Sequence, residues 1–117
     1  MDSAGAMAGY YVTSIGLFEP YERSAGTIKT FKISGAIAAF ATGIDASGTV
    51  CGFSESATGP LEGFSRSSSG TVTVLTAPGA GTKVGTGTEA YGINTGGVIV
   101  GQYITTSGAY GAIFWTP

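Results

Sequence analysis

The chain contains no histidine, and this absence excludes several kinds of chemistry. Without histidine, neither a Ser-His-Asp triad nor a Cys-His catalytic pair can form. Only one cysteine, Cys51, is present, so we expect no internal disulfide and no zinc site built from cysteine and histidine. The sequence therefore predicts no cofactor and no bound metal.

Charged residues are also scarce. The chain has 5 Lys and Arg against 7 Asp and Glu among 117 residues, with a formal net charge of −2. Proteins that bind nucleic acid through its phosphates carry a basic patch or stripe. The basic residues here are spread from Arg23 to Lys83 and form no such cluster. Nucleic acid is therefore not an expected partner.

Long apolar segments are missing as well. No continuous apolar run approaches the length needed to cross a bilayer, so we expect no membrane span. The start of the chain, MDSAGAMAGYY, lacks the basic segment followed by an apolar segment that marks a signal peptide. We expect no export signal in this chain, and the residues alone leave its compartment unknown.

Glycine and small apolar residues make up much of the chain. Glycine occupies 21 positions, and hydrophobic residues account for 43% of the sequence. Disordered chains combine low hydrophobicity with high net charge, which is the opposite of this composition. A chain of this length has room for one domain. We therefore expect residues 1–117 to fold as a single domain.

Three segments resemble one another and indicate an internal repeat of about forty residues. They are MDSAGAMAGYY from Met1, IDASGTVCGFS from Ile44 and INTGGVIVGQY from Ile93, at offsets of 43 and 49 residues. Downstream, the same offsets relate GLFEPYER, GPLEGFSR and GAYGAIFW. We divide the chain into units of about 1–43, 44–92 and 93–117.

Each unit predicts antiparallel β structure. TVTVLTA is rich in β-branched residues and ends at Pro78-Gly79, a turn signal. GTVCGF and GVIVGQY carry apolar residues on both faces, which is typical of strands covered on two sides. Asp45 and Asn94, each followed by glycine three residues later, suit tight turns. We expect up to four strands per unit, ten in all, because the first unit lacks its short inner strand and the third lacks its last.

The segment APGAGTKVGTGTEAYGINTGGVIVGQYITTSGAYGAIFW resembles the HAF-type "probable extracellular" repeat family. Its most specific points are Pro78-Gly79-Ala80 and Gly92-Ile93-Asn94. The resemblance implies a β-propeller-like, all-β architecture and a bacterial, extracellular origin, and it implies no established activity. At the family's His-Ala-Phe position this chain has Glu19-Pro20-Tyr21, Glu62-Gly63-Phe64 and Gly111-Ala112-Ile113. Any role of that histidine is therefore not transferred.

About three blade-like units are too few for a propeller, which has four to eight blades. A homodimer that closes a six-bladed ring would complete the structure, and so would a longer repeat protein of which this chain is a fragment. The alternative is a closed pseudo-threefold fold within one chain, a β-prism or β-trefoil. We favour a homo-oligomer, with a dimer first, because exposed strand edges invite further pairing.

Candidate binding residues recur at equivalent places in the first two units. Glu19 and Arg23 match Glu62 and Arg66, and residues four apart on a strand share a face. Such pairs are either repeated ligand pockets or solvated ion pairs of little energetic weight. Tyrosine and tryptophan are favoured where sugars or protein partners bind. The predicted binding residues are Tyr11, Glu19, Arg23, Glu62, Arg66 and Trp115.

Other candidates receive structural interpretations. Most aromatic residues, including Tyr10, Phe53, Tyr103, Tyr110 and Phe114, are expected in the core. Cys51 aligns with Ala8 and Val100, which indicates a small buried hydrophobic side chain. Asp2, Asp45 and Asn94 are assigned to turns rather than to a calcium site, because no further acidic residues accompany them.

These observations predict a protein that is not an enzyme. The first hypothesis is a binding or interaction module that recognises carbohydrate or another surface through repeated pockets. The alternative is a structural, oligomer-forming repeat protein. A glycoside hydrolase using Glu19 and Glu62 is the third hypothesis, and it requires two carboxylates about 5 to 10 Å apart.

Overall fold

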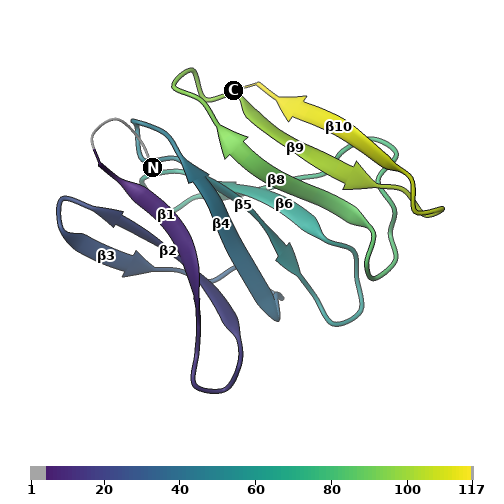
Figure 1. The fold of residues 1–117 in the computed structure, drawn as a ribbon, viewed down its shortest axis with the longest axis horizontal. Coiled ribbons are helices and arrows are strands. Elements are labelled where there is room, and N and C mark those ends of the chain that lie inside the picture. The colour runs from purple at the N-terminus through teal and green to yellow at the C-terminus, as the bar shows by residue number, and fades with distance from the viewer. Residues whose placement is uncertain (1–4, 117) are drawn as a thin grey trace.

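The computed structural model describes residues 5–116, and these form ten strands and no helix (Figure 1). The number of strands is the one expected from the sequence. Their bounds are β1 Met7–Val12, β2 Phe18–Ser24, β3 Thr27–Thr30, β4 Ala38–Ile44, β5 Val50–Glu55, β6 Glu62–Arg66, β7 Val72–Leu75, β8 Gly87–Ile93, β9 Ile99–Ile104 and β10 Tyr110–Trp115.

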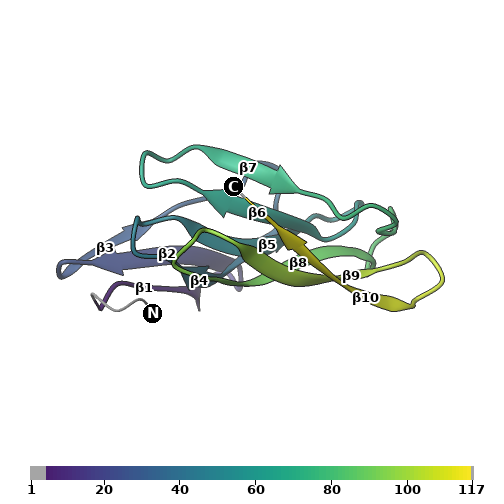
Figure 2. The same ribbon diagram turned by 90° about the horizontal axis from the view of Figure 1, so that it is seen from above.

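The strands fall into three consecutive antiparallel groups, which we call the first unit (β1–β3), the second unit (β4–β7) and the third unit (β8–β10). The first and second units form one seven-stranded sheet, and the third unit is a separate three-stranded sheet. Neither sheet closes on itself within the described residues. The first and third units lie at opposite ends of the long axis (Figures 1 and 2).

Very little backbone pairing crosses from one unit to the next. A single parallel pair, Phe18 with Ala38, links the first unit to the second. An isolated parallel bridge, Leu61 with Gly87, links the second unit to the third. The units are therefore held together mainly by side chains.

The central hairpins of the three units pair in equivalent register. Met7 pairs with Arg23, Val50 with Arg66, and Ile99 with Trp115. The paired residues follow the offsets of 43 and 49 found in the sequence. A register shift interrupts β4 between Ala41 and Gly43, and β8 between Ala90 and Gly92. The second and third units thus share their strand pairing as well as a bulge.

Glycine is required opposite these bulges. A Cβ atom on Gly52 would collide with the carbonyl oxygen of Phe40, and one on Gly101 would collide with that of Glu89. Both contacts are with backbone, which cannot move aside as a flexible side chain can. The recurring glycine in the centre of the VCGF and VGQY segments is therefore explained by close approach of the two strands.

The Asp and Asn turns have the predicted structure. Asp45 Oδ1 accepts bonds from the N–H groups of Ser47 and Thr49 at 3.0 and 2.9 Å, and Gly48 has a φ of 86°. Asn94 Oδ1 accepts bonds from the N–H groups of Gly96 and Val98 in the same way. Asp2, the third residue predicted in such a turn, lies outside the described residues.

Three further turns use the same hydrogen bonds and were not predicted. They begin at Thr13, Ser67 and Thr105, whose hydroxyl oxygens accept the N–H of the residue four positions later. In each, the first and fifth residues are bonded through the backbone, and the fourth residue is a glycine with positive φ. This is the three-residue hairpin loop with a glycine bulge.

Two hydrophobic clusters lie between the units. The first consists of Ala41, Ile44, Val50 and Phe64, packed against Ala6, Ala8, Phe31 and Ile33 of the preceding unit and its flanking segments. The second consists of Cys51, Ala90 and Ile99, together with Leu75, Ile93 and Trp115. The core is therefore divided into two layers, one at each junction between units.

Exposure differs from the sequence prediction at the two ends of the molecule. β5 is buried on both faces, as predicted, but in β9 Val100 is 51% exposed. The assignment of most aromatic residues to the core is wrong, because Tyr10, Tyr110 and Phe114 are exposed by 50%, 69% and 66%. The sequence pattern predicts two covered faces for the β5 and β9 segments, whereas among the described residues the terminal units are covered on one.

Candidate interaction surfaces

The recurring charged residues do not form two equivalent pockets. Glu62 and Arg66 lie on β6, yet Arg66 pairs with Glu22 of β2 at 3.2 Å rather than with Glu62. Glu19 of β2 pairs with Lys32 at 3.8 Å rather than with Arg23. Within residues 5–116, Arg23 and Glu62 make no ion pair. The structure therefore separates the members of each predicted pair.

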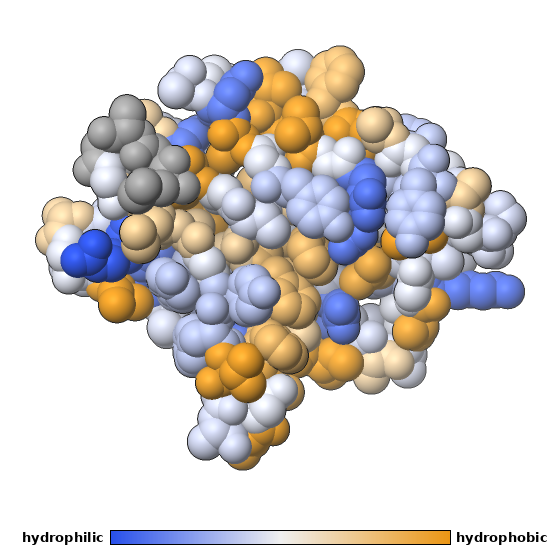
Figure 3. Space-filling view, viewed as in Figure 1, coloured by the Kyte–Doolittle hydropathy of each residue, from blue (hydrophilic) through white to orange (hydrophobic). Residues whose placement is uncertain are grey.

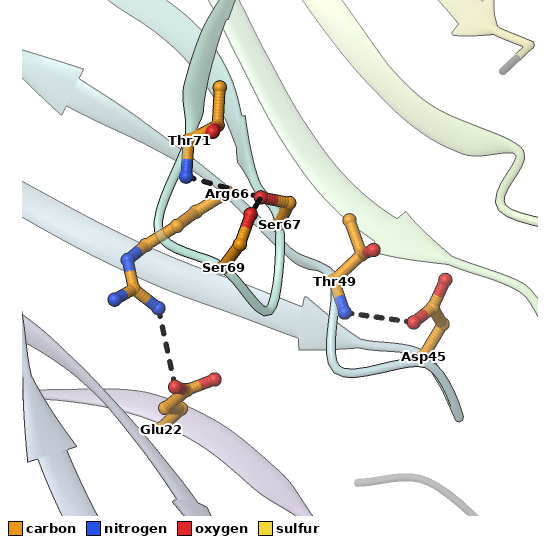
Figure 4. Close-up of polar contacts among 7 residues, drawn as sticks. All are labelled: Glu22, Asp45, Thr49, Arg66, Ser67, Ser69 and Thr71. Atoms are coloured by element: carbon orange, nitrogen blue, oxygen red, sulfur yellow. Dashed lines mark hydrogen bonds and ion pairs between the residues drawn. The ribbon is translucent and has the colours of Figure 1, made fainter.

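Arg66 lies at the junction between the first and second units (Figure 4). Its guanidinium donates to Glu22 Oε1 and sits 4.6 Å from the centroid of the Phe31 ring. The side chains of Arg66 and Glu22 are only 16% and 10% exposed. Because both side chains are nearly buried, solvent and salt screen their charges less than they screen an exposed ion pair. The ion pair and the cation–π contact therefore help to fix how the first and second units pack.

Tyr11 and Glu19 form a second polar cluster, on the first unit. They are cross-strand partners, and the Tyr11 hydroxyl donates to Glu19 Oε2 at 2.6 Å. This hydrogen bond is the main cause that raises the pKa of the Tyr11 hydroxyl. Tyr11 is 37% exposed, so the cluster is accessible to a partner.

The face of the first unit that points away from the second unit carries Met7, Tyr21, Arg23 and Ile28, and we call these residues the N-terminal face. Arg23 is the cross-strand partner of both Met7 and Ile28, so the three share this side of the sheet. Tyr21 lies against Gly9, where a Cβ atom would meet its ring at 3.0 Å. Ile28 is 61% exposed. Tyr11 and Glu19 lie on the same side of β1 and β2, so this surface combines apolar side chains with the Arg23 cation and the Tyr11–Glu19 pair.

The side of the third unit opposite Ile99 and Trp115 carries Val100, Tyr110 and Phe114. Tyr91 extends this surface, and its ring also meets Phe53 of the second unit. We call these four residues the C-terminal face. Val100 and Phe114 are cross-strand partners, whereas their neighbours Ile99 and Trp115 pack toward the second unit. Tyr91 is 45% exposed, and its hydroxyl accepts a hydrogen bond from Gln102 at 3.3 Å. Burial, followed by Glu89, raises the pKa of that hydroxyl.

Aromatic rings also connect the three units. Tyr10, Phe18 and Phe40 contact one another, with centroids 4.8 to 5.9 Å apart. Phe40 stacks on Phe53 at 5.0 Å, and Phe53 meets Tyr91 at 5.8 Å. The space-filling view shows apolar side chains gathered in the middle of the molecule and at the protruding tip of the β1–β2 hairpin (Figure 3).

Trp115 lines a hollow between the second and third units, which we call the Trp115 hollow. Its rim is rich in hydroxyl groups, supplied by Ser47, Thr49, Ser65, Thr73 and Thr95. Trp115 and Arg66 hold the same register position in their hairpins, opposite Ile99 and Val50. At the second junction, Trp115 and Ser65 stand at the positions that Arg66 and Glu22 hold at the first. Both line the hollow, whereas Arg66 and Glu22 are joined by an ion pair.

Cys51 is fully buried, as predicted, and burial raises the pKa of its thiol. The described residues contain no cluster of three or more His, Cys, Asp or Glu side chains able to hold a metal ion. Among residues 5–116 there is also no helix long and apolar enough to cross a membrane.

Comparisons of the chain with protein-family models, with curated proteins and with solved structures found no match. The resemblance to the HAF-type repeat therefore stays a prediction.

Glu22 and Phe31 are the site residues that sequence reasoning missed. Neither is repeated, because Ser65 and Leu75 stand at the corresponding places. The available signal was alternation along β2, where Pro20 and Glu22 share one face and both are buried. A carboxylate on a covered face needs a cationic partner, and Arg66 is that partner.

Proposed function

We propose that this protein is a non-enzymatic interaction module that binds further copies of itself. The C-terminal face carries the proposal: Tyr91, Val100, Tyr110 and Phe114 are all at least 45% exposed on one side of one sheet. Gln102 lies among them and donates to Glu89 and Tyr91, so the surface combines exposed aromatic and apolar side chains with a few polar groups. Exposed apolar side chains gathered on one face mark interaction sites.

The unpaired strand edges support the same proposal. Within the described residues, β1 pairs only with β2, and β10 pairs only with β9. Open edges tend to recruit further strands or sheets unless something covers them. Two copies would supply six units, which falls within the range of a propeller-like ring. We infer that such a ring, rather than a β-prism or β-trefoil closed within one chain, is the completed form.

The glycoside hydrolase hypothesis has less support. Glu19 and Glu62 line two different hollows, one beside Lys32 and the other beside Pro60. A glycosidase needs both carboxylates on either side of one scissile bond. We therefore retain the interaction module as the proposed function.

Light scattering over a range of protein concentrations tests self-association. We expect the wild-type mass to rise above that of the monomer at micromolar concentrations, and Tyr110→Lys to shift the transition to about tenfold higher concentration or more. Val84→Lys is the control, because Val84 is also exposed, at 62%, and lies in the loop before β8. A wild-type chain that stays monomeric throughout would refute the proposed function.

Carbohydrate recognition is the second candidate, and the Trp115 hollow favours it. An aromatic ring with hydroxyl groups around it suits a sugar, which offers an apolar ring face and many hydroxyls. The residues predicted from sequence contribute only Trp115 to this hollow, because Tyr11, Glu19 and Arg66 lie on the first unit or at its junction.

A glycan array with purified protein tests this second candidate. We expect any bound glycan to be lost in Thr95→Arg, since Thr95 is exposed and lines the hollow. Thr82→Arg, in the exposed loop after β7, is the matched control. Binding that survives Thr95→Arg would exclude this hollow as the carbohydrate site.

A further inference from the structure

The two junctions within the chain follow one rule of association. At the first, Ala8 and Glu22 of the earlier unit face Val50 and Arg66 of the later unit, through the hydrophobic cluster and the ion pair. At the second, Cys51 of the earlier unit packs with Ile99 and Trp115 of the later unit.

Strand register identifies the same two positions in every unit. Ala8 pairs with Glu22, Cys51 with Ser65, and Val100 with Phe114. Met7 pairs with Arg23, Val50 with Arg66, and Ile99 with Trp115. At each junction, the earlier unit contributes the pair equivalent to Ala8–Glu22. The later unit contributes the pair equivalent to Val50–Arg66.

One pair of each kind is left without a partner unit. Val100 and Phe114 form the free pair of the third unit, and Met7 and Arg23 form the free pair of the first unit. The chain thus carries both halves of its own junction, at opposite ends of the long axis (Figure 1).

We propose that copies associate head to tail, with the C-terminal face of one copy packed on the N-terminal face of the next. This inference rests on the proposed self-association and specifies its geometry. In the contact, Val100 meets Met7, and the guanidinium of Arg23 lies over the ring of Phe114. Arg66 already makes a contact of this kind with Phe31, at 4.6 Å. The contact is heterologous, because two different surfaces meet.

The contact between copies is smaller than the internal junctions. The first junction includes Ala41 and Ile44 of β4 and Phe31, which follows β3. Among the described residues, the first unit has no strand equivalent to β4, and the third unit has no strand equivalent to β3. Association is therefore weaker than the packing inside the chain, and it depends on protein concentration.

A charge-swap series at Phe114 distinguishes this contact from a symmetric one. Phe114→Glu places a carboxylate opposite Arg23, as Glu22 stands opposite Arg66, so head-to-tail association is kept within about threefold of wild type or tightened. Phe114→Arg places two guanidinium groups together and weakens association by about tenfold or more. Adding Arg23→Glu to Phe114→Arg restores the opposite charges and the association. Val84→Glu and Val84→Arg are the controls for the charge alone.

The outcomes separate the two proposals. If the wild type never associates, the proposed function fails. If the wild type associates but Phe114→Glu and Phe114→Arg weaken it equally, two C-terminal faces meet each other and the head-to-tail contact is wrong. Association that ignores every change at Phe114 and Arg23 also overturns it. Circular dichroism of each variant confirms folding, which we expect because both side chains are exposed.

Discussion

Arg66 is held by a carboxylate, an aromatic ring and its own strand. Glu22 and Phe31 come from the first unit, whereas Arg66 belongs to the second, so the contact spans 44 residues of sequence. Because both charged side chains are nearly buried, removing one leaves the other without a partner in a site that water reaches poorly. At the residue scale, this is the polar interaction with the most effect on how the units are placed.

We predict that Glu22→Gln lowers the free energy of unfolding by about 2–3 kcal/mol, because the Arg66 charge loses its partner. Chemical denaturation measures the change. Glu62→Gln is the matched control, since Glu62 is exposed and makes no ion pair among the described residues, and it should change little. Combining Glu22→Gln with Arg66→Met should cost less than the sum of the single changes. Equal losses for Glu22→Gln and Glu62→Gln would contradict the assignment.

At the scale of the secondary-structure elements, the turns determine the register of the strands. Five loops share one hydrogen-bonding pattern, and the β2–β3 loop is different because Ala25 and Gly26 alone connect the paired residues Ser24 and Thr27. Both loop residues have positive φ, at 49° and 79°. Two-residue hairpin loops of this kind prefer Asn-Gly, and an alanine in the left-handed region is strained.

We predict that Ala25→Asn raises the free energy of unfolding by about 1 kcal/mol, because asparagine tolerates the left-handed conformation. Thermal unfolding monitored by circular dichroism measures the effect. Ala46→Asn is the control, as Ala46 is also an exposed turn residue but has no positive φ. A stability gain shared by both variants would point to a general effect of asparagine in loops instead.

The sequence was informative about elements and less so about contacts between them. The ten strands and the Asp45 and Asn94 turns were predictable, because β-branched runs and glycine spacing are local signals. The turns at Thr13, Ser67 and Thr105 were available from the same spacing, with a hydroxyl in place of the carboxylate or amide. The Arg66–Glu22 pair was not, because it depends on which faces of two distant hairpins meet.

At the scale of the whole molecule, the three units form an open row with different surfaces at its two ends. The repeat offsets indicate about three units, which are too few to close a propeller. The exposed residues of the C-terminal face show one of the surfaces where a further unit could pack. The sequence did not identify this face, because valine and phenylalanine, as at Val100 and Phe114, are residue types usually buried in a core. Only the order of the units shows that nothing in the described chain follows to cover them.

The junctions between units affect how such a chain can evolve by gain or loss of a unit. Among residues 5–116, one residue pair crosses each junction by backbone pairing, Phe18 with Ala38 at the first and Leu61 with Gly87 at the second. An in-frame duplication or loss of one unit therefore breaks no hairpin and leaves each remaining unit its own hydrogen bonds. Variation by whole units is the change that this architecture tolerates best, whereas insertion of one residue within a strand moves the side chains that follow it to the opposite face.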